Sequence, residues 1–99
     1  MTNAWTRARE EVLKSLEDAL KKLKFKVKKE ELENSLEEPP SAKMGDLACS
    51  ISFQLGKKEK VSPRDIAEQI LATVKRPAIA KKVALAGAYV NFFFNRGAF

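Results

Sequence analysis

Apolar side chains recur every three or four residues over residues 4–24, which is the spacing of an amphipathic helix. Val12, Leu16 and Leu23 belong to this apolar stripe, and Trp5 stands near its start. Lysines crowd its C-terminal end, where they suit the negative end of the helix dipole: Lys21, Lys22, Lys24, Lys26, Lys28 and Lys29. A basic amphipathic helix can also lie on a membrane surface, but the interspersed acidic residues and ordinary core stripe favour packing within a globular domain.

A short, charged segment follows over residues 30–37. If this segment is extended, Leu32 and Leu36 lie on one side, so the pattern predicts a weak edge strand. The Pro-Pro pair at 39–40 ends any regular element, because each ring fixes φ and removes a backbone donor. We expect a loop over 41–45.

Two helices are predicted within residues 46–76. The first begins at Asp46, which would serve as its N-cap, and ends near Gly56. The second begins with Ser62 as N-cap and Pro63 at the first helical position. Its expected buried stripe is Ile66, Ala67, Ile70, Leu71 and Val74.

Towards the end of the chain the apolar period changes to two. Val83 and Leu85 indicate a short strand, Gly87-Ala88 a bend or bulge, and residues 89–95 a second strand. Alternate side chains of the last strand point to opposite faces of the sheet: Val90, Phe92 and Phe94 to one, and Tyr89, Asn91 and Phe93 to the other.

This order of elements predicts a single α+β domain, with three main helices packed on one face of a small, mainly antiparallel β-sheet. We divide residues 1–99 into four parts: helix 1 and its basic end (1–29), a strand and Pro-rich loop (30–45), two helices (46–76) and the closing strands (79–95).

Composition excludes much chemistry. The chain has no histidine, so it offers no imidazole general base or His-ligated metal, and its single Cys49 excludes an internal disulfide. No nucleotide-binding motif is present, and we expect no catalytic residue, metal or cofactor. The longest apolar run, residues 83–94, is too short at 12 residues to span a bilayer. One cysteine fits a reducing, cytoplasmic location.

The net charge of +6 arises entirely after residue 38. Residues 1–38 hold nine basic and nine acidic side chains, whereas residues 39–99 hold ten basic and four acidic ones. Such an excess is typical of a polyanion-binding face, and equally of a solvated surface rich in lysine. The candidates for phosphate contact are Lys57, Lys58, Lys60, Arg64, Lys81, Lys82 and Arg96.

The last strand carries the most informative side chains. If Val90 and its neighbours fill the core, then Tyr89, Asn91 and Phe93 form the other face, where aromatic rings beside an amide suit an unstacked base. Packing of this face under the helices is the alternative. Residues 88–92 also match half of the RRM signature, but the other half and the element order fail, so we treat that match as accidental.

Three segments in series resemble the N-terminal domain of arginyl-tRNA synthetases. Residues 38–48 (EPPSAKMGDLA) look like its Pro-rich loop and Gly-Asp start, residues 62–70 (SPRDIAEQI) resemble its Pro-Arg-x-Ile-Ala helix, and residues 83–92 (VALAGAYVNF) are similar to its closing strand. The order and spacing agree through nearly the whole chain.

The resemblance implies a non-catalytic domain that binds the D-loop at the outer corner of tRNA and positions tRNA(Arg) for a separate catalytic domain, in cis or in trans. It implies that Tyr89 packs on a D-loop base and that Asn91 hydrogen-bonds the base edge. We expect a monomer with no membrane partner. The class I signatures H-I-G-H and K-M-S-K-S are absent, so we expect that this chain alone does not activate arginine, as its full-length parent would.

Two other functions stay open. Helix 1, with Trp5, could dock a synthetase or another partner as a protein-interaction module. The chain could also be a free-standing general RNA-binding domain, which would bind unrelated structured RNAs with similar affinity.

Overall fold

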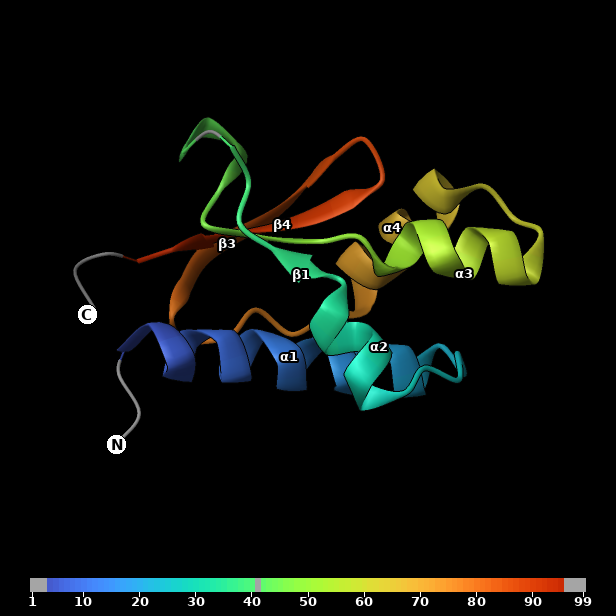
Figure 1. The fold of residues 1–99 in the computed structure, drawn as a ribbon, viewed down its shortest axis with the longest axis horizontal. Coiled ribbons are helices and arrows are strands. Elements are labelled where there is room, and N and C mark those ends of the chain that lie inside the picture. The colour runs from blue at the N-terminus through green and yellow to red at the C-terminus, as the bar shows by residue number, and fades with distance from the viewer. Residues whose placement is uncertain (1–3, 41, 96–99) are drawn as a thin grey trace.

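Helices pack against a four-stranded antiparallel sheet in the computed structural model, which describes residues 4–40 and 42–95 (Figure 1). The elements are α1 (Ala4–Lys22), α2 (Lys29–Asn34), β1 (Leu36–Glu37), the 3-10 turn η1 (Ala42–Met44), β2 (Leu47–Cys49), α3 (Ile51–Glu59), α4 (Pro63–Thr73), β3 (Ala80–Ala86) and β4 (Tyr89–Phe94). The expected α+β class is confirmed.

The strands lie in the order β1-β2-β4-β3, so β4 is central. β3 and β4 form a hairpin whose two-residue loop is Gly87-Ala88. Gly87 has a φ of +62°, while Ala88 keeps a negative φ, as a type II′ turn requires. The closing strands predicted from the period-two pattern are therefore confirmed, with their bend as a tight turn.

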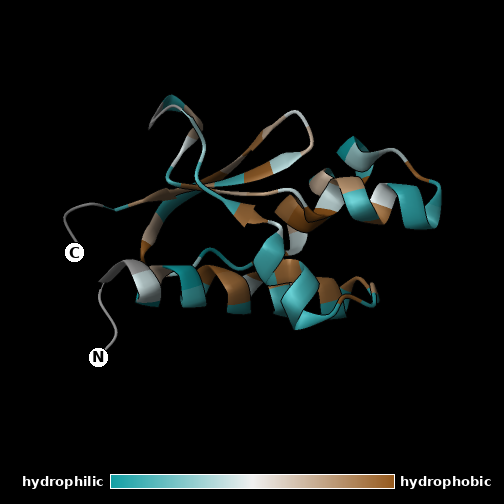
Figure 2. Ribbon diagram, viewed as in Figure 1, coloured by the Kyte–Doolittle hydropathy of each residue, from teal (hydrophilic) through white to brown (hydrophobic). Residues whose placement is uncertain are grey.

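The core lies between the sheet and the helices. Val12 and Leu16 of α1 are fully buried, as are Ile66 and Ile70 of α4, so both predicted stripes are confirmed in their main positions. From the sheet, Val90, Phe92 and Phe94 enter this core as the alternation predicts. In Figure 2 the hydrophobic segments gather where helices and sheet meet, and the outer turns of α2 and α3 are hydrophilic.

α1 ends in a Schellman motif. The Phe25 N–H donates to the Leu20 carbonyl and the Lys24 N–H to the Lys21 carbonyl, both at 3.0 Å. Lys24 has a φ of +64°, at the position that glycine usually takes. This turn reverses the chain and leads it to α2.

The predicted edge strand over 30–37 is largely wrong. Most of this segment is the helix α2, and only Leu36 and Glu37 form a strand. Glu30 and Glu31 in the first turn favour the positive end of a helix dipole. The Arg9 guanidinium, in turn, donates to the Glu33 carbonyl at 2.9 Å, which satisfies an acceptor at the end of α2.

The predicted start of the next helix is also wrong. Leu47–Cys49 form strand β2 between β1 and β4, and α3 begins only at Ile51. All three residues of β2 are buried, and a short buried run reads alike as strand or helix. Instead of capping a helix, the Asp46 carboxylate accepts a hydrogen bond from the Phe94 N–H at 2.8 Å.

Candidate nucleic-acid interface

The candidate interface is built on the face of β4 opposite the core. Tyr89, Asn91 and Phe93 alternate along this face, at intervals of roughly 7 Å for every second residue of a strand. The cross-strand neighbours of Tyr89 and Asn91 are small: Ala86 lies opposite Tyr89, while Ala84 and Ala48 flank Asn91. Two aromatic rings therefore rise on either side of a flatter strip that has one amide at its centre.

Tyr89 is half-buried and contacts an aromatic residue that the sequence analysis did not assign to the site. The ring of Phe53, near the start of α3, meets it edge to face, with centroids 5.1 Å apart and an interplanar angle of 62°. Phe53 is 39% exposed. The available signal was its position two residues after Ile51, off the buried side of the helix. Phe53 steadies Tyr89 and enlarges the exposed aromatic surface.

Asn91 lies on the expected face but is not open to solvent, since its exposed fraction is 2%. Its amide nitrogen donates to the Met44 carbonyl at 2.6 Å, so η1 folds back over the centre of the strip. Its Oδ1 is buried and has no hydrogen-bond partner. Burying such an acceptor without a partner costs about 1–3 kcal/mol of folding free energy, so Asn91 lowers the stability of the domain at this position.

The loop beside Asn91 is tied to β4 by its backbone. The Asp46 N–H donates to the Phe92 carbonyl at 2.9 Å, next to the Asp46–Phe94 hydrogen bond. Gly45 has a φ of +100°, and a Cβ there would lie 3.0 Å from the Phe92 carbonyl oxygen. A glycine is therefore needed for the loop to approach β4 this closely.

Phe93 closes the other end of the strip together with a candidate phosphate contact. The Lys82 ammonium lies 4.4 Å from the centroid of the Phe93 ring, within cation–π range. Lys82 and Phe93 are cross-strand partners, whereas Lys81 occupies the register irregularity between Ala80 and Lys82. Arg96, the remaining candidate from this part of the sequence, lies outside the described residues.

The other phosphate candidates lie around the far end of α3. Lys57 follows Phe53 by one helical turn, on the same side of the helix, and so extends the interface. Lys58 and Lys60 lie further towards the tip. Arg64, in the first turn of α4, forms an ion pair with Glu68 at 3.4 Å. The structure thus brings Lys82 and Lys57 to the strip and separates Lys58, Lys60 and Arg64 from it.

A family model described as the arginyl-tRNA synthetase N-terminal domain matches residues 10–94. The chain belongs to this family. The matched range includes the Gly45-Asp46 loop, Phe53 and the whole of β4. The resemblance stated from the sequence motifs is therefore confirmed.

Curated proteins similar to this chain include arginine–tRNA ligases. That of Methanosphaera stadtmanae is 38% identical over 91 residues, covering 92% of this chain and 16% of the ligase. That of Methanothermobacter thermautotrophicus is 39% identical over 85 residues, covering 86% of this chain and 15% of the ligase. The chain thus spans about a sixth of these relatives.

A solved structure supports the same fold. Arginyl-tRNA synthetase from Thermus thermophilus matches with a TM-score of 0.77 and 24% identity, covering 91% of this chain and 14% of that protein. At this identity the likeness shows the fold of the synthetase N-terminal domain and nothing of its residues' roles.

The described residues offer no other obvious chemistry. Cys49 is a buried core residue in β2, and burial raises the pKa of its thiol. Within residues 4–40 and 42–95, no three His, Cys, Asp or Glu side chains gather to hold a metal ion. No helix in those ranges is long and apolar enough to cross a membrane. The side chain of Trp5 lies outside the described part.

Proposed function

We propose that this chain is a non-catalytic tRNA-binding domain. It recognises the D-loop at the outer corner of tRNA(Arg) and positions the tRNA for aminoacylation by a catalytic arginyl-tRNA synthetase domain, in cis or in trans. The row of Tyr89, Asn91 and Phe93 on β4, with Lys82 beside it, carries the proposal. Membership of a synthetase N-terminal domain family supports the choice of tRNA.

Tyr89 supplies the stacking surface in this proposal. Its ring is held from one side by Phe53, so part of its side chain stays available without much freedom to lose on binding. Lys82 and Lys57 stand at the two ends of the strip and neutralise phosphates of the bound loop. Phosphate contacts give affinity and orientation, and the base contact gives specificity.

Asn91 reads the base edge after a local rearrangement. Its amide nitrogen now holds the Met44 carbonyl, and its Oδ1 has no partner. When η1 lifts away from β4, the amide can offer one donor and one acceptor to a base. The new bonds replace the one to Met44 and satisfy the unpaired oxygen, which lowers the net cost of opening the loop.

Tyr89→Ala tests the stacking role. Loss of one base–aromatic stack, about 1–3 kcal/mol, weakens tRNA(Arg) binding roughly 5- to 150-fold, and Tyr89→Phe keeps most of the affinity. Val61→Ala is the matched control, because Val61 is an apolar residue 41% exposed away from the strip. Titrations of folded variants with labelled tRNA(Arg) measure the effect.

Two results contradict the proposal. Wild-type affinity in a folded Tyr89→Ala variant removes the stacking role. Equal affinity of the unchanged protein for tRNA(Arg) and for unrelated structured RNAs assigns it to general RNA binding instead.

A further inference from the structure

A second basic surface lies at the end of the molecule formed by the turn after α1 and the last turn of α3. Residues 21–29 contain six lysines and no acidic residue. We call this surface the lysine-rich end; its members are Lys21, Lys22, Lys24, Lys26, Lys28, Lys29, Lys58 and Lys60. All eight side chains are exposed, and Figure 1 shows both segments at the same end of the fold.

A hydrogen bond joins the two segments. The Lys58 ammonium donates to the Lys26 carbonyl at 3.2 Å, which brings the end of α3 beside the 23–28 segment. Residues 1–38 have no net charge as a whole, but their acidic residues lie before residue 19 and after residue 29. The part between is therefore strongly basic, and the fold places it beside the basic end of α3. Among the described residues, no carboxylate comes within 4.0 Å of the eight ammonium groups.

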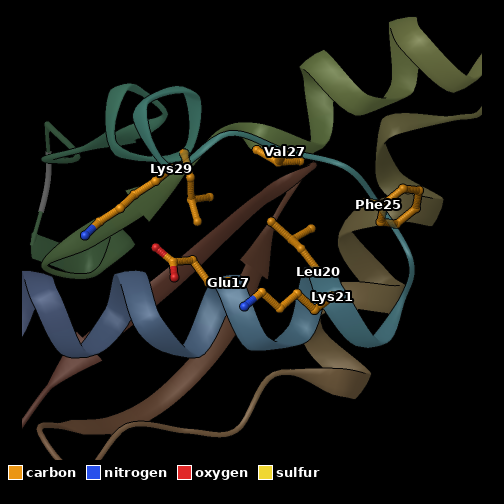
Figure 3. Close-up of a pocket in the computed structure, with 7 residues that line it drawn as sticks. Glu17, Leu20, Lys21, Phe25, Val27 and Lys29 are labelled. Atoms are coloured by element: carbon orange, nitrogen blue, oxygen red, sulfur yellow. The ribbon is translucent and has the colours of Figure 1, made fainter.

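The 23–28 segment presents its lysines on one side. Leu23, Phe25 and Val27 are half-buried and pack against the core, while the lysines between them are exposed. Phe25 and Val27 also line a hollow of about 230 Å³ between α1 and α2 (Figure 3). Since these apolar side chains are half-buried and pack against the core, most of their surface is withheld from a lipid bilayer. This favours a hydrated polyanion over a membrane as the partner.

Two lysines of this surface occupy backbone positions that favour glycine. Lys24 follows α1 with a φ of +64°, and Lys60 follows α3 with a φ of +56°. They are the only non-glycine residues with positive φ in the described ranges 4–40 and 42–95. A left-handed conformation costs an L-residue about 1–2 kcal/mol, so this end of the fold keeps two lysines in a conformation that glycine adopts more easily.

We propose that the lysine-rich end binds the phosphodiester backbone of RNA, at a place distinct from the strip on β4. The domain then holds one RNA at two points, by base recognition on β4 and by sequence-independent phosphate contact here. The inference rests on the proposed tRNA binding only for the choice of RNA as the polyanion. Exposed lysines at every second position, Lys24, Lys26 and Lys28, give this segment several ammonium groups for the phosphates of a strand.

The test uses the full chain and a blunt RNA duplex without unpaired bases, so that base stacking contributes nothing. Lys24→Gln/Lys26→Gln is compared with Lys14→Gln/Lys75→Gln, which removes the same charge from two exposed lysines elsewhere. We expect the first pair to weaken duplex binding about tenfold at low salt and to lower the log–log salt slope by about 1–2, and the control pair to do neither. Lys24→Arg/Lys26→Arg retains binding.

Three outcomes overturn the inference. If both glutamine pairs lose the same affinity for the duplex, binding depends on net charge alone and not on this surface. If the first pair binds the duplex as tightly as the wild type, the surface does not bind RNA. Loss of binding to phosphatidylserine vesicles in the first pair, with unchanged duplex binding, assigns the surface to membranes. Tyr89→Ala separates the two proposals. If both are correct, this variant binds tRNA more weakly and binds the duplex as the wild type does. Unchanged tRNA binding in Tyr89→Ala contradicts only the proposed base recognition on β4.

Discussion

Gly56→Ala has two opposing effects on the free energy of unfolding, a gain in helix propensity and a loss in packing, and the structure indicates which is larger. Gly56 lies buried inside α3, where alanine is intrinsically better than glycine by about 1 kcal/mol. A Cβ at this position would lie 2.8 Å from Cγ of Pro63 and 2.9 Å from the Val61 carbonyl oxygen. The Val61 N–H donates to the Gly56 carbonyl at 3.0 Å, so the loop between α3 and α4 cannot retreat without straining this bond.

The magnitude follows from these two effects. Overpacking costs about 1–3 kcal/mol, and the strained hydrogen bond adds about 1 kcal/mol. After the gain in propensity, the net loss of unfolding free energy is about 1–3 kcal/mol. For a domain of this size that loss lowers Tm by about 5–20 °C.

Thermal and urea unfolding followed by circular dichroism measure the change. Ala72→Gly is the matched control, since Ala72 is exposed on α4 and reports the glycine–alanine difference alone, a loss of about 1 kcal/mol. If Gly56→Ala unfolds at or above the wild-type temperature, the close approach of α3 to the Val61–Pro63 segment does not constrain the fold and the reasoning fails.

Three further predictions follow from the backbone and the core. Gly45→Ala destabilises more than Gly87→Ala in the same unfolding assay, because both have positive φ but only Gly45 would bring a Cβ to 3.0 Å from a backbone oxygen; equal losses would remove the role of that contact. Lys24→Gly removes a lysine from a left-handed conformation, so it raises the free energy of unfolding by about 1 kcal/mol and weakens RNA-duplex binding. The gain is measured as a higher urea midpoint, and an unchanged midpoint would show that the lysine is not strained. Burial raises the pKa of Cys49 above its ordinary value of 9.0, so above that pH the folded state keeps a proton that the unfolded state loses, and the free energy of unfolding falls as the pH rises. Cys49→Ala makes this fall with pH less steep, and the same dependence on pH in both proteins would contradict the assignment.

The parts of the fold that the sequence predicts are those with a long periodic signal. α1 repeats its apolar stripe over five turns, and the hairpin of β3 and β4 alternates on both sides of a Gly-Ala turn. β2 has three residues, all buried, so neither period can be read from it. Its identity as a strand depends on pairing with β4, and that long-range contact is not encoded in the local pattern.

The candidate site divides in the same way. Strand parity predicts that Tyr89, Asn91 and Phe93 share a face, because parity is a local property. It does not predict that η1 covers Asn91, since this depends on a glycine at 45 and on Asp46 hydrogen bonds to residues far along the chain. The partnership of Phe53 with Tyr89 is likewise a product of tertiary packing.

Local rules of folding are broken at four described positions. One is Ser52 in α3, whose buried Oγ has no hydrogen-bond partner, and the other three lie at the two proposed RNA contacts. Asn91 buries an acceptor without a partner, and Lys24 and Lys60 hold left-handed conformations that glycine adopts more easily. Each departure costs on the order of 1 kcal/mol or more in a domain whose total stability is of the order of 5–15 kcal/mol. None of the three is needed to close the core, since the buried apolar cluster is complete without them. Sites at which a sequence sacrifices local stability are where function is expected, so three of the four departures favour the same two surfaces as the charge and aromatic side chains.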